Sequence, residues 1–354
     1  MKSTIRSKTR YSTTLTLGAF AAAALCAGTA HAEYITSSIS VMADGQFTVS
    51  GGNIHYWSAS SGYSTYNLST GATTTIGKPP AGTSSNGFGD PFGVYDSSSG
   101  TFYTASFRSG GSSYIYRHDS ASGSWLQNSG STYGTELVNA YGGATRNGQL
   151  YVSGLVEPWN GGYGQSTFIS LFDADGRQDT LIETANNSAY LAVDGDGGVY
   201  YGIFNLGGSS SLYYWTAEQV ASVTNDLYAE GAVDTFLTLA DGQILLDIDG
   251  GFNGLTVDEA GNIFFSVNGG SAGSVVGMVD DSSEGYAVIY DGPGMWYGAL
   301  SIDGDFNDGA TLYMNNYGEI VGIAVPEPAT YAALFGLFAL AFAARRQALS
   351  SKKA

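Results

Sequence analysis

The sequence contains almost no cysteine, because its only one, Cys26, lies within the first 32 residues. The rest of the chain therefore forms no internal disulfide and carries no cysteine thiolate chemistry. Lipid modification of Cys26 is disfavoured, since such a site needs a small residue before the cysteine and Leu25 stands there. A chain of this length without disulfides must be stabilised by a large apolar core.

Basic residues are scarce between positions 33 and 325. Five are present, Lys78, Arg108, Arg117, Arg146 and Arg177, against 30 acidic residues, which gives a net charge of −25. Such a surface repels nucleic acid and anionic lipid headgroups, so we expect no nucleic-acid partner. A solvated, calcium-tolerant extracellular setting and simple solubility explain this charge equally well.

Long apolar runs are missing from the middle of the chain and occur only near its two ends. At the start, a basic leader is followed by an apolar stretch from Leu15 to Ala27 and by Ala30-His31-Ala32. This order predicts a secretory signal peptide over residues 1–32, cut by signal peptidase after Ala32, with Ala30 and Ala32 as the small residues of the cleavage pattern. A retained membrane anchor is the alternative, although the run is short for a span.

Glycine and aromatic residues are abundant. The chain has 51 Gly, 25 Tyr, 17 Phe and 5 Trp. Disordered chains lack this aromatic content. A glycine-punctuated chain rich in Tyr, Phe, Val and Thr predicts many short strands joined by tight turns.

One unit recurs six times: a strand, a turn with a glycine, and a second, aromatic-rich strand. The turn glycines are Gly45, Gly100, Gly148, Gly198, Gly261 and Gly309. A Gly-Gly loop and a third strand follow each of the first five copies, and several continue into a fourth strand. Four strands in a period of about 50 residues are typical of a propeller blade.

Two copies, residues 191–201 and 255–264, resemble the blade hairpin of NHL- and kelch-type propellers, as in Val257-Asp258-Glu259-Ala260-Gly261-Asn262-Ile263-Phe264. The resemblance implies that the aspartate closes the turn between the first two strands, whereas Arg146 stands at this place in the third copy. We therefore expect an all-β propeller of about six four-stranded blades over residues 33–324. A β-sandwich or a β-helix is the alternative, since strand patterns alone do not separate these folds.

Two segments depart from the repeat. The sixth copy is incomplete after Gly318, so a strand over residues 34–39 is expected to complete it. Residues 216–228 have apolar positions at helical spacing, with Thr216 as N-cap, and predict a short helix inserted in the fourth unit.

The C-terminus combines Val325-Pro326-Glu327-Pro328, an apolar segment over residues 330–344, and a basic tail over 345–354 that begins with Arg345-Arg346. This order resembles the PEP-CTERM sorting domain. The resemblance implies a brief transmembrane helix, a transient anchor in the inner membrane of a Gram-negative bacterium, and processing by an exosortase, which recognises Pro326, Glu327 and Pro328. It also implies delivery to the cell surface or outside the cell of a bacterium that makes extracellular polysaccharide. A plain tail anchor is the alternative.

Oxygen-bearing side chains alternate at Asp303, Asp305 and Asn307. If the body binds a metal ion, we expect calcium at these three residues, because such oxygen ligands suit a hard cation. The EF-hand pattern fails here, since Asp308 and Met314 stand where it needs glycine and glutamate. An ordinary aspartate–glycine turn is the alternative.

Aromatic residues gather in two predicted loops, at Trp159 and Tyr163 and at Trp296 and Tyr297. Both loops are expected on one face of the propeller. Exposed aromatic rings beside carboxylates and amides provide the flat platform that a sugar ring needs. The alternative is that these rings cover the ends of the blades.

These features favour an exported, non-catalytic protein that binds a glycan or another protein in an extracellular polysaccharide matrix. The alternatives are a propeller enzyme, such as a metal-assisted hydrolase or lyase, and a purely structural matrix protein. The region after residue 32 has only two histidines, His55 and His118. Scarcity of His, Lys and Arg disfavours an enzyme, because acid–base and oxyanion roles usually draw on them.

Overall fold

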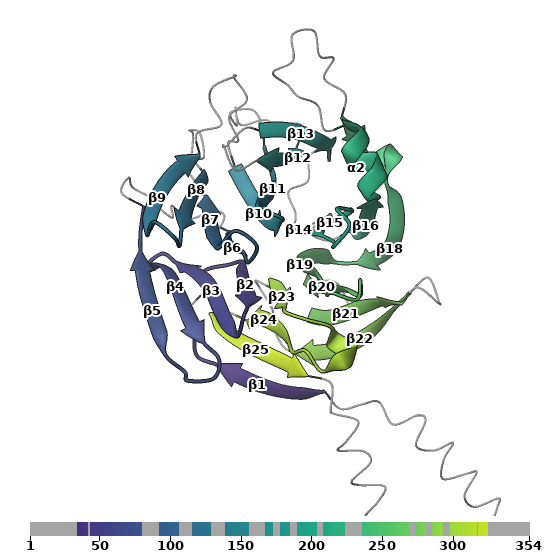
Figure 1. Cartoon of the computed structure of the whole chain (residues 1–354). Helices are drawn as coiled ribbons and strands as arrows, with labels where there is room; N and C mark the ends of the chain where they lie inside the picture. The colour runs from purple at the N-terminus through teal and green to yellow at the C-terminus, as the bar shows by residue number, and fades with distance from the viewer. Residues whose placement is uncertain are drawn as a thin grey trace, which may run out of the picture. The chain divides into compact units, whose positions relative to one another are not determined.

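The computed structural model describes residues 34–41, 43–79, 92–105, 115–128, 139–155, 167–172, 178–184, 190–203, 208–223, 236–268, 274–280, 285–292, 298–316 and 318–324. Six sheets, antiparallel except for one parallel pair of strands, stand around a central axis as the blades of a propeller (Figure 1). The predicted fold class is confirmed, and the sandwich and β-helix alternatives are wrong. The predicted signal peptide and C-terminal sorting segment lie outside the described residues. Within those residues, no helix is long and apolar enough to cross a membrane.

The first three blades follow one another along the chain. Blade 1 consists of β2 (Phe47–Ser50), β3 (Asn53–Ser58), β4 (Gly62–Asn67) and β5 (Thr73–Gly77). Blade 2 consists of β6 (Gly93–Asp96), β7 (Thr101–Ala105), β8 (Ile115–Asp119) and β9 (Ser124–Asn128). Blade 3 consists of β10 (Asn139–Arg146), β11 (Gln149–Leu155), β12 (Thr167–Phe172), β13 (Gln178–Glu183) and β17 (Leu237–Thr238).

The other three blades complete the ring. Blade 4 consists of β14 (Leu191–Val193), β15 (Val199–Gly202), β16 (Ser209–Trp215) and β18 (Gln243–Asp249). Blade 5 consists of β19 (Gly251–Val257), β20 (Ile263–Asn268), β21 (Ser274–Asp280) and β22 (Gly285–Gly292). Blade 6 consists of β23 (Leu300–Ile302), β24 (Leu312–Asn316), β25 (Glu319–Ala324) and β1 (Ile35–Ile39).

The ring closes through β1, which pairs antiparallel with β25 from Ile35 opposite Ala324 to Ile39 opposite Ile320. The first strand of the chain therefore becomes the outermost strand of the last blade, as predicted for residues 34–39. This pairing joins the two ends of the propeller without a covalent bond. β25 is thereby paired on both sides, and β1 forms the outer edge of blade 6.

The structure corrects two details of the predicted repeat. The first hairpin turns at Gly51-Gly52, between β2 and β3, and Gly45 lies before β2 in the link between blades. Blade 3 has five strands instead of four, because β17 pairs in parallel with β13.

The predicted helix is present as α2 (Ala217–Val223), in the segment that joins β16 to β18. Gln219 N donates to Thr216 Oγ1 (3.2 Å), and Thr216 N donates to Gln219 Oε1 (2.9 Å), so the two residues cap the helix reciprocally. The same segment supplies β17 to blade 3. Its 224–235 part lies outside the described residues.

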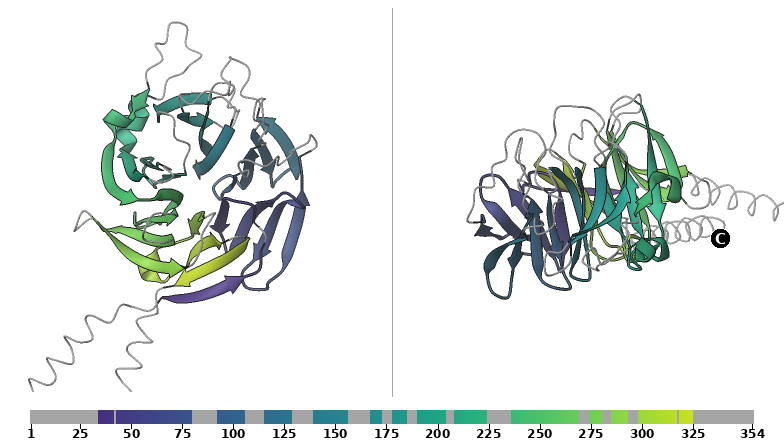
Figure 2. Two further views of the ribbon diagram at one scale, coloured as in Figure 1. Left: turned by 180° about the vertical axis from the view of Figure 1, so that it is seen from behind. Right: turned by 90° about the horizontal axis from the view of Figure 1, so that it is seen from above.

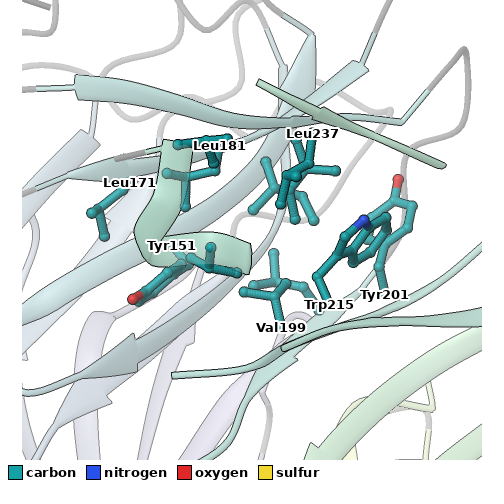
Figure 3. Packing of buried hydrophobic residues seen from close by; sticks show 12 residues of the cluster. Tyr151, Leu171, Leu181, Val199, Tyr201, Trp215 and Leu237 are labelled. Carbon is teal, nitrogen blue, oxygen red and sulfur yellow. The ribbon is translucent and has the colours of Figure 1, made fainter. Parts of the chain in front are cut away.

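Apolar side chains fill the spaces between blades. Between blades 3 and 4 they include Tyr151, Leu171, Leu181, Val199, Tyr201, Trp215 and Leu237 (Figure 3). The Trp215 ring is fully buried, and its Nε1 donates to Thr238 O (3.1 Å), which fixes β17 against blade 4. Each such buried side chain contributes about 1.5–3 kcal/mol to folding, which is how the fold is stabilised without disulfides.

The propeller has two faces, which appear edge-on in the right-hand view of Figure 2. The turn face carries the connections between the first and second strands of the blades, at residues 51–52, 97–100, 147–148, 194–198, 258–262 and 303–311. The loop face is the opposite one, where the innermost strands β2, β6, β10, β14, β19 and β23 begin.

Candidate functional site

Aspartates close the turns on the turn face, as the NHL- and kelch-type resemblance implied. Asp194 Oδ1 accepts backbone N–H groups at distances of 2.8–2.9 Å from residues 196–198. Asp258 Oδ1 accepts from Asn262 N (2.8 Å), while its Oδ2 accepts from Phe306 N of blade 6 (3.0 Å). The aspartates at this position therefore lock turns and, at Asp258, also join neighbouring blades.

Arg146 occupies the aspartate position in blade 3 and forms hydrogen bonds with the neighbouring blade 4. Its Nε and Nη2 donate to Gly195 O of blade 4 at 3.1 and 2.7 Å. The departure from the repeat thus replaces a turn-closing acceptor with a donor that ties blades 3 and 4 together.

The three candidate calcium ligands also lie on the turn face. Asp303 Oδ2 accepts from Gly51 N of blade 1 (2.7 Å), and Asp305 Oδ1 accepts from Asn307 N (2.8 Å) at the start of a 3-10 helix, η3 (Phe306–Asp308). In the part of the chain that the structure describes, no group of three His, Cys, Asp or Glu side chains could hold a metal ion. Calcium binding therefore stays a prediction, while both carboxylates have structural partners.

Both histidines belong to one buried aromatic cluster between blades 1 and 2. The His55 ring stacks on Tyr95, with centroids 3.7 Å apart, and His55 Nδ1 lies 2.8 Å from the Tyr63 hydroxyl. Burial lowers the pKa of His55 to about 4 and also lowers the pKa of His118, while burial raises the pKa of Tyr63. The His118 ring makes an edge contact with Trp125 at 5.1 Å. Near neutral pH, His55 is thus an uncharged packing residue.

A repeated pairing lies near the loop face, where a glycine of the innermost strand is opposite a hydroxyl residue of the second strand. The pairs are Gly93 with Thr104 in blade 2, Gly142 with Ser153 in blade 3, and Gly254 with Ser266 in blade 5. All three hydroxyl residues are fully buried. These pairs were not predicted from the sequence, although small and aromatic residues alternate in the hairpins that contain them.

Two innermost strands carry a β-bulge at this same level. The register shifts between Ala140 and Gly142 in β10 and between Phe252 and Gly254 in β19, so Tyr141 and Asn253 are the extra residues. Each lies five positions before the residue that begins its turn, Arg146 or Asp258. Bulges re-aim side chains and are frequent beside functional sites.

The Asn253 side chain is 5% exposed, and among the described residues its Nδ2 has no hydrogen-bond partner. A buried donor in this condition costs about 1–3 kcal/mol. Native proteins pair nearly all such groups, so each exception calls for an explanation. The loop-face ends of the innermost strands, with Asn253 as their unsatisfied donor, are therefore the candidate functional site.

The candidate site is held by long-range hydrogen bonds. Asn315 Nδ2 of blade 6 donates to Ala43 O (3.0 Å) and Gly45 O (2.8 Å), in the link that leads into blade 1. The neighbouring Gln46 side chain reaches Gly143 of blade 3 through two further bonds. Blades 6, 1 and 3 are thus joined near the loop face by two amide side chains.

The aromatic residues predicted to form a sugar platform, Trp159, Tyr163, Trp296 and Tyr297, lie outside the described residues. Trp159 and Tyr163 belong to residues 156–166, which join β11 to β12. Trp296 and Tyr297 belong to residues 293–299, which join β22 to β23. Pro326, Glu327, Pro328, Arg345 and Arg346 also lie outside the described part, as do Val325, Ala30 and Ala32.

Comparison with known proteins finds no matching family model and no significant match among curated proteins. Solved structures match over most of their length. A candidate gluconolactonase matches with 14% identity and a TM-score of 0.55, covering 84% of this chain and 96% of that one. The PQQ-bound aldose sugar dehydrogenase of Streptomyces coelicolor matches with 15% identity and a TM-score of 0.54, covering 84% and 99%.

A glucose dehydrogenase matches equally well, with 10% identity, a TM-score of 0.54 and coverage of 83% of this chain and 99% of that one. At these identities the similarity establishes the fold. The neighbours are nevertheless propeller enzymes, so the comparison favours the enzyme alternative over the non-catalytic binding protein that we expected from the sequence. The expectation of a non-catalytic protein gave too much weight to the scarcity of His, Lys and Arg, because it assumed that catalysis depends on these residues.

Proposed function

We propose that this protein is a propeller enzyme that hydrolyses a sugar lactone, or a similar neutral carbohydrate ester, at its loop face. The observation that carries the proposal is the full-length match to three propellers named as a gluconolactonase candidate, an aldose sugar dehydrogenase and a glucose dehydrogenase. These names share one substrate class, aldoses and the lactones formed from them. The buried Asn253 amide on the same face, whose Nδ2 has no hydrogen-bond partner among the described residues, supports a ligand that presents oxygen atoms.

The positions of the positively charged side chains favour hydrolysis over quinone-dependent oxidation. Pyrroloquinoline quinone has three carboxylates, which need cationic partners. The cations of the described residues are Lys78 after β5, Arg117 on β8 and Arg146 at the turn-face end of β10, so none lies at the loop-face end of an innermost strand. The described cations therefore do not fit the quinone, while Arg108 and Arg177 lie outside the described residues. We base the proposal of a hydrolase on the described cations, and the assay with quinone tests it.

The acidic body also suits lactone hydrolysis. Water adds to the lactone carbonyl carbon, the bond from that carbon to the ring oxygen breaks, and a proton passes to the ring oxygen. A neutral substrate thereby becomes a hydroxy acid that is anionic at neutral pH. A body with a net charge of −25 does not repel the substrate but does repel the product.

The test uses the purified full-length protein and a panel of aldonolactones, with acid release followed by a pH indicator. Each assay is run with calcium and with chelator, and parallel assays offer aldoses with pyrroloquinoline quinone and a redox dye. We expect lactone hydrolysis above the spontaneous rate and no quinone-dependent dye reduction. Dye reduction without lactone hydrolysis would overturn the proposal.

Loop aromatics provide a second test. We expect Trp296→Ala and Trp159→Ala to raise KM about 10-fold, because each removes a flat surface for the sugar ring. Tyr286→Ala is the matched control, since Tyr286 is a 37% exposed aromatic residue on β22, the outermost strand of blade 5. Equal effects of all three substitutions on KM would argue against a platform in the loops.

We also propose that the chain is exported and sorted. The signal-peptide pattern of residues 1–32 and the PEP-CTERM resemblance of residues 325–354 support this, with exosortase, signal peptidase and the inner membrane as transient partners. Extracellular polysaccharide would then surround the enzyme. Mass spectrometry of the protein from its native host tests the proposal: we expect an N-terminus at Glu33 and a chain that ends near the Pro-Glu-Pro motif, whereas an intact mass extending to Ala354 contradicts it.

A further inference from the structure

Asn253 lies where the innermost strand of blade 5 begins, on the loop face, and it is the extra residue of a bulge. Its neighbour Phe252 packs into the apolar cluster between blades 4 and 5, with its ring centroid 5.5 Å from that of Phe265. The bulge inserts one residue into the strand and breaks the regular alternation of side chains. The position of the Asn253 side chain is therefore set by the bulge and not by the regular strand pattern of the blades.

The described backbone beside Asn253 is closely packed. A Cβ atom at Gly254 would lie 1.9 Å from Gly298 O of the neighbouring blade, so only glycine fits there. Gly298 O accepts a hydrogen bond from Ser266 Oγ at 2.5 Å. The Asn253 amide therefore lies beside a glycine-lined junction, and among the described residues its Nδ2 has no hydrogen-bond partner.

We infer that Asn253 Nδ2 is a fixed hydrogen-bond donor to an oxygen atom of the ligand that binds at the loop face. The inference rests on the proposed function for the class of ligand, a neutral sugar lactone, whose hydroxyl or carbonyl oxygen accepts this bond. If the acceptor is the carbonyl oxygen, the donor stabilises the negative charge that develops there as water adds. A preorganised donor of this kind loses little entropy when the ligand binds.

Asn253 also lies close to Gly298, the first described residue after residues 293–297. Gly298, whose Cβ position would lie 3.5 Å from Asn253 Cβ, directly follows Trp296-Tyr297 in the chain. The acidic charge of the body and the neutral amide together favour an uncharged oxygen over a carboxylate or phosphate as the acceptor.

The experiment compares Asn253→Leu, Asn253→Asp and Asn253→Ser with Asn315→Leu in the full-length protein, and measures both lactone kinetics and thermal midpoint. Asn253→Leu and Asn253→Asp should lower kcat/KM about 10- to 100-fold, and Asn253→Ser, which keeps a shorter donor, should lower it less. Asn253→Leu should leave the midpoint unchanged or raise it, because it removes an unpaired donor. Asn315→Leu should lower the midpoint, because Ala43 O and Gly45 O lose their donor.

The outcomes separate this inference from the proposed function. Wild-type protein that hydrolyses no lactone overturns the proposed function and, with it, this inference. Active wild-type protein with Asn253→Asp and Asn253→Ser within twofold of its kcat/KM overturns the inference alone. A midpoint that falls in all Asn253 variants as it does in Asn315→Leu, without a change in kcat/KM, would make Asn253 a structural residue.

Discussion

The side chain of Gln46, directly before β2 of blade 1, forms hydrogen bonds with both backbone groups of Gly143 in blade 3. Gln46 Nε2 donates to Gly143 O (2.5 Å), and Gly143 N donates to Gln46 Oε1 (2.9 Å). The side-chain amide thus pairs with a backbone amide as a neighbouring strand would. Gln46 is 8% exposed, and the two residues are 97 positions apart in the chain.

Gln46→Ala should lower the free energy of unfolding by about 2–3 kcal/mol, because it leaves a buried N–H and a buried C=O without partners. Urea denaturation measures the change. Gln243→Ala, at an exposed position on β18, is the matched control and should stay within about 0.5 kcal/mol of the wild type. Equal free energies of unfolding for the two variants would show that hydrogen bonds to water replace those of Gln46 without loss of stability.

Acidification should destabilise the protein through His55. The unfolded chain binds a proton on this residue below about pH 6.5, whereas the folded chain does so only near pH 4, because burial lowers its pKa. Unfolding therefore takes up a proton, and stability falls between pH 6.5 and about 4 by up to about 1.4 kcal/mol per pH unit.

The measurement is urea denaturation at pH 7, 5.5 and 4.5 for the wild type, His55→Asn and His118→Asn. His55→Asn should reduce the loss of stability with falling pH, since asparagine does not titrate and keeps a polar atom near Tyr63. His118→Asn should reduce it less. A wild type and a His55→Asn variant with the same pH dependence would contradict the assignment.

Asp303 should act in ring closure. Asp303→Ala removes the acceptor of Gly51 N, which joins blade 6 to blade 1, and should lower stability by about 1 kcal/mol because both groups are exposed. We expect the same loss in calcium and in chelator, measured as thermal midpoints. A calcium-dependent rise of the wild-type midpoint that disappears in Asp303→Ala would instead assign calcium to Asp303, Asp305 and Asn307.

The repeat was predictable because local turn chemistry marks it. Asp258 and Gly261 close a turn within five residues, and such short-range patterns are legible in one sequence. The first copy was misplaced for the same reason, since Asp44-Gly45 also has the composition of a turn. Gly51 and Gly52 form the real hairpin, with φ of 56° and 74°, a pair of left-handed residues that suits the twist of two joined strands.

The site was less predictable because it depends on contacts between distant residues. Nothing near Gln46 in the sequence indicates Gly143, and β17 joins blade 3 although it follows three strands of blade 4. The bulge at Asn253 inserts one residue in a strand whose local composition looks regular. Such features follow from how blades pack on one another, which strand periodicity does not encode.

The closing strand β1 begins shortly after the proposed signal-peptide cleavage site. Cleavage after Ala32 would leave Tyr34 and the whole of β1 in the chain, so the processed protein would keep its closing strand. A chain that begins at Ser40 should lose about 2–4 kcal/mol of stability, because β25 becomes an unpaired edge and the contact between the Tyr34 and Phe306 rings is lost. A chain that begins at Glu33 is the matched control.

Adding a peptide of residues 33–40 distinguishes loss of the strand from general damage. The peptide should raise the thermal midpoint of the chain that begins at Ser40, since it can pair with β25 in the register of Ile35 with Ala324. It should not change the chain that begins at Glu33, where β25 is already paired. Blade 6 would close the ring without β1 if the chain that begins at Ser40 had the same thermal midpoint as the chain that begins at Glu33. The same conclusion would follow if the peptide did not change the midpoint of the shortened chain.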